Sequence, residues 1–185
     1  MNNRQDRQVY LSVDEPFAAS IQKDILGDNS GSSVEDWLTA VAKKAMDSAS
    51  EGTEPAQMSL LITGDDTVHS LNAKFRGLDE VTDVLSFSAD HGGHWESEAD
   101  PPEKPDGFDF ILPPGEPPPL GEVIVSYPQA QRQAEERAVP LEYELALLVV
   151  HGVLHLTGHD HIEREEAELM QSRERAALAK LNIHA

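Results

Sequence analysis

The chain has 185 residues, of which 39% are hydrophobic, and its 34 acidic residues against 14 Lys and Arg give a formal net charge of −20. This length and apolar content predict one globular domain spanning residues 1–185. Cysteine is absent, which excludes disulfide bonds and thiolate metal ligands and suits a cytoplasmic protein. The sequence has neither an apolar run of 18 residues nor an N-terminal secretory pattern, so we expect no membrane association.

The acidic charge argues against nucleic acid as a partner, because clustered Lys and Arg make phosphate contacts. Residues 89–119, however, contain eight acidic residues against one Lys, together with eight of the twelve prolines. We expect this acidic, proline-rich insert to be a loop or disordered, because it cannot bury enough apolar surface to offset its ordering entropy. The insert contributes seven units of negative charge (eight minus one), so much of the acidity lies outside the expected core.

Hydrophobic periodicity predicts the secondary structure, with Ser33 as a helix cap and Gly77 as a helix stop. The pattern favours an α+β fold, in which a single mixed sheet of about four strands is packed with helices. In chain order, the expected elements are a strand at 8–13, a helix at 34–45, a strand at 57–63, a helix at 65–76, strands at 82–88 and 120–126, and helices at 128–138, 141–157 and 162–182.

The stretch from His151 to His161 carries the strongest chemical signal. His151 and His155 are four residues apart in a helical segment, so both imidazoles lie on one face, about a turn apart. Gly158 ends that helix and lets the chain turn back to deliver His161. Three imidazole ligands leave a fourth position for water, as in catalytic zinc sites that polarise a phosphoryl or carbonyl oxygen. We expect one Zn²⁺ per chain at the end of this central helix, although imidazoles also bind other divalent transition metals.

The histidine spacing matches that of metzincin proteases, with one difference. Those proteases carry Glu directly after the first His as the general base, and this chain has Gly152 there. A peptidase built on this helix would lack its proton acceptor. Hydrolysis of a peptide or another amide therefore stays an alternative function.

Three sequence blocks stand out, which are LNAKFRGLD (71–79) continuing to TDVLSF (82–87), LGEVIVS (120–126), and EL (144–145) followed by HGVLHLTGHDH (151–161). Together they resemble the YbeY family of bacterial metal-dependent endoribonucleases. The resemblance implies an α+β fold, a three-histidine zinc site and hydrolysis of phosphodiester bonds in single-stranded RNA. It also implies maturation of the 3′ end of small-subunit rRNA and ribosome quality control, with the small ribosomal subunit and its proteins as partners.

By motif position, the resemblance makes His151, His155 and His161 the metal ligands and Arg76 the functionally important arginine. Considered alone, the Arg76 guanidinium could clamp a phosphate and stabilise transition-state charge. Without the resemblance, we would instead expect a surface arginine paired with one of the many carboxylates, such as Asp79.

A non-catalytic ribosome assembly factor with a structural metal is the other alternative function.

The chain departs from the family pattern at three places. His159 stands where the family usually has an aromatic residue, and we expect it to be a spare polar side chain rather than a fourth ligand. Glu122 stands where the family usually has Asp. The 89–119 insert is longer than the usual connection, and its role is open.

Other polar residues have alternative roles. Asp160 with Glu163 forms a capping-box pattern for the last helix, or a hydrogen bond to a ligand histidine. Glu144 orients a ligand or pairs with an Arg, and Asp83 holds Arg76 or a water. The general base is left open.

Overall fold

Four strands form one mixed sheet in this computed structural model, which describes residues 7–15, 17–27, 31–49, 54–89, 115–159 and 164–185. The strand order is β1-β2-β4-β3, in which β1, β2 and β4 are parallel and β3 pairs antiparallel with β4 at one edge. The expected α+β fold with one mixed sheet is confirmed. The strands are β1 (Arg7–Val13), β2 (Ala56–Thr63), β3 (Val84–Ser88) and β4 (Pro119–Ser126).

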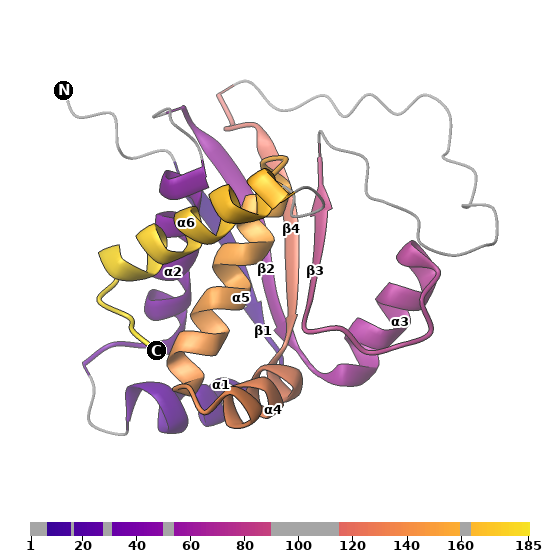
Figure 1. Cartoon of the computed structure of the whole chain (residues 1–185), viewed down its shortest axis with the longest axis vertical. Coiled ribbons are helices and arrows are strands. Elements are labelled where there is room, and N and C mark those ends of the chain that lie inside the picture. The colour runs from indigo at the N-terminus through magenta and orange to yellow at the C-terminus, as the bar shows by residue number, and fades with distance from the viewer. Residues whose placement is uncertain (1–6, 16, 28–30, 50–53, 90–114, 160–163) are drawn as a thin grey trace.

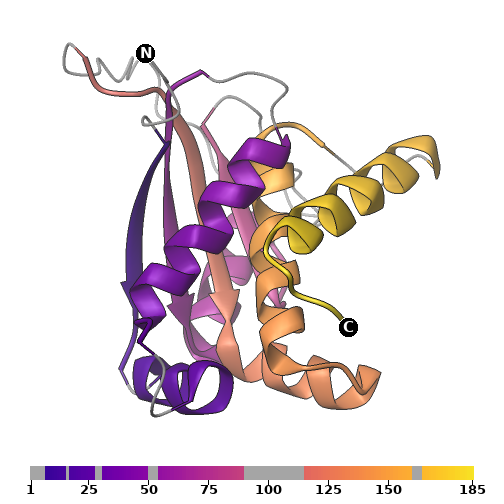
Figure 2. The ribbon, with the colours of Figure 1, turned by 90° about the vertical axis from the view of Figure 1, so that its left-hand side faces the viewer.

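Helices cover both faces of the sheet (Figures 1 and 2). Helices α2 and α5 pack on one face with α6 against both of them, and α3 packs on the other face over β3 and β4. Within the described ranges, none of the helices has the length and apolar character needed to cross a bilayer. The helices are α1 (Phe17–Ile21), the π-helical turn η1 (Gln22–Leu26), α2 (Val34–Ala49), α3 (Asp65–Arg76), α4 (Tyr127–Arg137), α5 (Leu141–Leu156) and α6 (Arg164–Lys180).

The expected helices and strands agree with the structure apart from the positions of their ends and from one segment, α1 with η1, that the sequence analysis did not predict. Ser33 caps α2 as predicted, because its Oγ accepts from the Asp36 N–H at 3.1 Å. Helix α1 and the turn η1 were not predicted, since five residues each are too few to show a helical period. Most of the expected insert, residues 90–114, lies outside the described residues.

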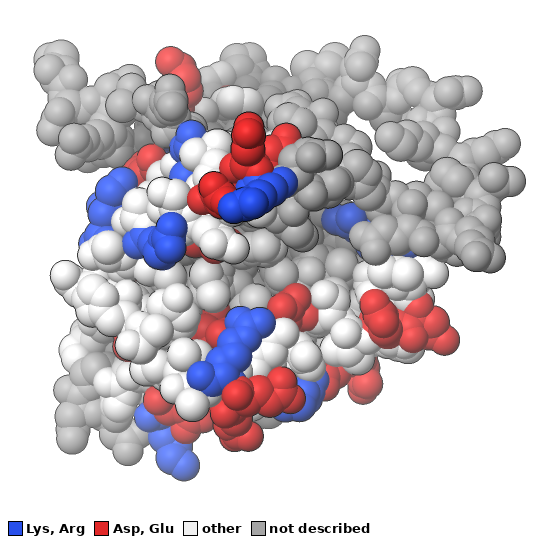
Figure 3. Space-filling model, viewed as in Figure 1, with Lys and Arg blue, Asp and Glu red and all other residues white. Residues whose placement is uncertain are grey.

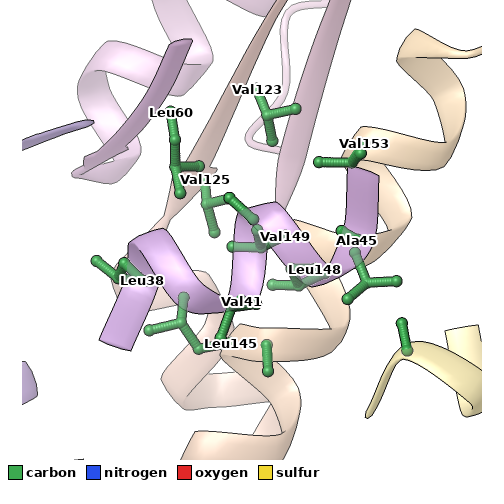
Figure 4. Packing of buried hydrophobic residues seen from close by; sticks show 14 of the residues in the cluster. Leu38, Val41, Ala45, Leu60, Val123, Val125, Leu145, Leu148, Val149 and Val153 are labelled. Carbon is green, nitrogen blue, oxygen red and sulfur yellow. The ribbon is translucent and has the colours of Figure 1, made fainter. Parts of the chain in front are cut away.

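The main core lies between the sheet and helices α2 and α5, where side chains from both helices meet those of β2 and β4 (Figure 4). Helix α5 is buried around most of its circumference, because it contacts the sheet, α2, α4 and α6. A helix that is apolar on nearly every face is expected in such a central position. The centre of the fold therefore supports the helix that carries the histidines.

Helix α5 lies close against the sheet at Gly152. A Cβ at this position would lie 2.6 Å from Val123 Cγ1 and 3.2 Å from Ser86 Oγ. Ser86 Oγ donates to the Gly152 carbonyl at 3.1 Å, and Ser88 Oγ donates to the Leu156 carbonyl at 3.0 Å. The last two turns of α5 are therefore held against β3 and β4 by contact and by two hydrogen bonds.

We expect Gly152→Ala to lower the free energy of unfolding by about 1–3 kcal/mol, as overpacking of a close-packed site does. The short, branched Val123 side chain cannot move its methyl away, so this cost exceeds the gain of about 1 kcal/mol in helix propensity. Urea unfolding measures the difference. Gly31→Ala is the matched control, because no atom lies within 4 Å of a Cβ there, and an equal effect at both positions would contradict the packing argument.

Candidate functional site

His151 and His155 lie side by side on the last turns of α5. Their Nε2 atoms are 3.1 Å apart, and their ring centroids are 4.7 Å apart. Two metal–nitrogen bonds of about 2.05 Å that span this separation would meet at an angle of about 100°, close to the tetrahedral value. The pair could therefore share one metal ion, and the predicted placement of both imidazoles on one helix face is confirmed.

Glu174 on α6 holds the ring of His151. Its Oε1 lies 2.8 Å from His151 Nδ1, and the two side chains are only 13% and 28% exposed. A carboxylate only accepts hydrogen bonds, so Nδ1 is the donor in this contact, and in the neutral imidazole this tautomer leaves the Nε2 lone pair facing His155. Carboxylates orient metal-ligating histidines in this way.

The end of α5 forms the turn that the sequence predicted. Gly158 has a φ of 82°, its N–H donates to the His155 carbonyl, and the His159 N–H donates to the Leu154 carbonyl, both at 3.1 Å. This is the Schellman arrangement of a helix C-terminus. The side chain of His159 turns toward α2, where its Nε2 lies 3.2 Å from the Ala49 carbonyl oxygen.

The third expected ligand, His161, lies outside the described residues, as do Asp160 and Glu163 of the expected capping box. Among the residues that the structure describes, no group of three metal-binding side chains occurs. The three-histidine site at the end of the central helix therefore stays a prediction, of which the structure places two members.

Arg76 is the last residue of α3, and Gly77 ends the helix in the left-handed conformation, as predicted. One amino group of the Arg76 guanidinium donates to the Ser86 carbonyl at 3.1 Å, and Ser86 Oγ in turn donates to the Gly152 carbonyl. Ser86 thus links the arginine to the residue that follows His151. The carboxylate that was considered as a partner of Arg76, Asp79, has its Oδ1 atom 2.8 Å from His69 Nε2.

Asp83 and Glu144 are engaged with α4. Asp83 accepts from Gln133 Nε2 of α4 at 2.9 Å and from Thr82 at 3.2 Å, so its expected role of holding Arg76 or a water stays a prediction. Glu144 is fully buried and pairs with Arg137 at 2.7 Å, which confirms one of its two predicted roles. Burial raises the pKa of Glu144, an effect that the nearby Arg137 opposes and Asp83 reinforces.

We expect Glu144→Gln to become more stable relative to wild type as pH rises. A carboxyl whose folded-state pKa is raised stabilises the fold fully below its unfolded-state pKa, and this contribution is lost as pH rises through the folded-state pKa. Urea unfolding from about pH 5 to about pH 9 measures the difference. The control is Glu136→Gln, which removes an exposed carboxylate of α4, and a Glu144→Gln difference that does not change with pH would contradict the expectation.

Sequence reasoning missed Glu174, Ser86 and Ser88. Glu174 had a signal, because it falls at helical spacing in the buried stripe of α6, four residues after Met170 and three before Ala177. A carboxylate in such a stripe needs a buried partner. The serines occupy alternate positions of a short strand, which places both hydroxyls on the face toward α5.

The fold and this geometry define an α+β protein with a candidate hydrolytic site where the end of α5 meets β3. The chain belongs to the Endoribonuclease YbeY family, because the model of that family matches residues 21–182.

Proteins named Endoribonuclease YbeY resemble the chain over most of its length. The relative from Rhodopseudomonas palustris is 38% identical over 151 residues, covering 82% of this chain and 70% of the relative. The relative from Dehalococcoides mccartyi is 39% identical over 143 residues, covering 77% and 78%. The relative from Roseiflexus castenholzii is 43% identical over 132 residues, covering 70% and 72%. These matches agree with the resemblance found in the sequence blocks.

Proposed function

We propose that this protein is a metal-dependent endoribonuclease that cleaves single-stranded RNA in the maturation of small-subunit rRNA. Family membership supports the endoribonuclease activity. The observation that best supports the proposed site is the pair of imidazole nitrogens of His151 and His155, which lie 3.1 Å apart. Hydrogen bonds through Ser86 connect the helix that carries this pair to Arg76.

The metal ligands in this proposal are His151, His155 and His161, and the metal is one Zn²⁺ or a similar divalent ion. The two described imidazoles fit the ion, because one nitrogen of His151 is held by Glu174 and the other faces His155. The chemistry that such an ion supplies is Lewis-acid polarisation of a phosphoryl oxygen and activation of a water.

Arg76 binds and orients the phosphodiester in this proposal. Its hydrogen bond to the Ser86 carbonyl fixes one edge of the guanidinium. A planar guanidinium offers several donors in a rigid fork, which suits phosphate oxygens and the charge that builds on them in the transition state.

The two alternative functions are less well supported. A metzincin-like peptidase needs a Glu at position 152, but that position faces Val123 and Ser86 inside the fold, where even a Cβ does not fit. A non-catalytic assembly factor does not explain why the relatives are named endoribonucleases.

The small ribosomal subunit and its proteins are the proposed partners, and the cytoplasm is the proposed location. The chain has only 14 Lys and Arg against 34 acidic residues, so phosphate contacts alone would bind naked RNA weakly. Recruitment by a ribosomal protein would raise the local concentration of the RNA end and compensate for that weakness.

Measurements of metal binding test the proposed metal site independently of catalytic activity. We expect purified wild type to contain one zinc per chain by elemental analysis, and His151→Ala to lose it. Glu174→Gln should bind zinc about 10–100-fold more weakly in competition with a chromophoric chelator, because the ring of His151 loses its carboxylate.

The matched control is Glu168→Gln on the same helix, where the carboxylate is 66% exposed and pairs with Arg164 at 3.0 Å. Its zinc affinity should equal that of wild type. Equal affinities for the Glu168 and Glu174 variants would show that Glu174 does not position His151.

RNA cleavage tests the function. We expect a single-stranded RNA oligonucleotide to be cut by the zinc-loaded protein, and cutting to stop with chelator. Arg76→Ala should lower kcat by about 100-fold or more, as the loss of a donor to transition-state charge does, and Arg76→Lys should restore little of it.

Arg132→Ala is the control for loss of a positive charge, because Arg132 is half-exposed on α4 and pairs with Asp65 at 2.8 Å. It should cleave RNA at the wild-type rate. If the His151→Ala variant cleaved RNA at the wild-type rate, the proposal would be wrong. Zinc-dependent turnover of peptides with RNA left intact would favour the peptidase.

A further inference from the structure

We infer that Phe75 is a stacking platform for a base of the single-stranded RNA, an inference that rests on the proposed function. Stacking on Phe75 would hold a base of the substrate whatever its identity and without using charge. The ring lies next in the sequence to Arg76, the arginine that would bind the phosphate.

Phe75 is a large apolar side chain left on the surface. It is 46% exposed at the end of α3, although a helix of this amphipathic kind normally turns such residues inward. Its ring meets that of Phe87 edge to face, with centroids 5.4 Å apart. Phe87 is itself packed against the small apolar cluster under α3, so the exposed ring stands on a fixed support.

Two cations lie next to Phe75 in the sequence of the same helix. Lys74 Nζ lies over the Phe75 ring, 5.0 Å from its centroid, so a base would stack on the other face of the ring, and Arg76 is the next residue along the chain. An aromatic face with adjacent positive charge is the arrangement by which proteins bind single-stranded nucleic acid, because the base stacks while the cations meet the backbone phosphates.

The platform adjoins the candidate catalytic centre through strand β3. Phe75 contacts the side chain of Phe87, and Arg76 contacts the carbonyl of the preceding Ser86. Ser86 reaches Gly152, the neighbour of His151, through its hydroxyl. One strand therefore connects the aromatic ring, the guanidinium and the histidine helix.

The charge of the protein explains why stacking would be needed. On the face shown in Figure 3, the described Lys and Arg side chains are interspersed with Asp and Glu rather than gathered into one basic patch. RNA cannot be held there by a broad positive surface. Stacking on an aromatic ring does not depend on charge, since every base has a π face.

Substitutions at Phe75 separate stacking from simple packing. Phe75→Leu keeps an apolar side chain against Phe87 and removes the aromatic face, whereas Phe75→Tyr and Phe75→Trp keep that face. We expect Phe75→Leu to raise KM for single-stranded RNA and to weaken its binding by about tenfold with little change in kcat, and Tyr or Trp to restore both. Thermal unfolding checks that each variant is folded.

The matched control is Tyr10→Leu. Tyr10 is 57% exposed on β1, the strand at the opposite edge of the same sheet. Its replacement should leave RNA binding and KM at wild-type values, because it lies away from α3 and β3.

The sharpest readout replaces one nucleotide of the RNA at a time with an abasic nucleotide and measures binding by fluorescence anisotropy. For wild type, one position should cost about tenfold in affinity, and for Phe75→Leu the same replacement should cost almost nothing. This loss of coupling is expected only if that base touches the ring.

The outcomes separate the two proposals. If wild type cleaves and binds RNA and Phe75→Leu behaves like wild type, or the abasic penalty is unchanged in the variant, the stacking platform is wrong and the endoribonuclease stands. If wild type with zinc neither cleaves nor binds single-stranded RNA, both are wrong.

Discussion

The close packing of α5 against β4 at Gly152 is the constraint on which the rest of the site depends. With no Cβ at this position, the helix backbone comes near enough for Ser86 and Ser88 to donate to its carbonyls. Those bonds fix the rotation of α5 about its own axis, which in turn sets the direction of His151 and His155. The same glycine removes the general base of a metzincin-like peptidase, so one packing requirement both orients the imidazoles and narrows the chemistry.

Two further elements complete the site from opposite sides of α5. Helix α6 supplies Glu174, which holds the ring of His151 from the side away from the sheet. Strand β3 lies on the other side, and its Ser86 carbonyl anchors the guanidinium of Arg76. The contacts that assemble the candidate centre thus join residues that are distant in the sequence. Ser86 and Gly152 are 66 residues apart, and His151 and Glu174 are 23 residues apart. Each contact is polar and partly buried, where hydrogen bonds are directional and costly to break.

The net charge of −20 argues against an RNA substrate. The structure weakens this argument, because it shows a local group of cations beside an aromatic ring. Overall charge governs long-range attraction, whereas catalysis and substrate positioning depend on groups within a few ångströms. Lys74, Phe75 and Arg76 place two cations and an aromatic ring together at the end of α3. Such a local cluster can bind a nucleotide while the rest of the surface keeps the protein apart from other polyanions.

The sequence alone determined the succession of strands and long helices along the chain. It also determined that His151 and His155 share one helix face, and that helices end at Gly77 and Gly158. These features follow from periodicity and backbone conformation, which depend on residues close together in the chain. Only the tertiary structure decided that Glu174 meets His151, that Arg76 reaches β3, and that Asp83 turns to α4. Such contacts depend on how distant segments pack, and among 34 acidic residues no local pattern identifies which carboxylate will face which partner.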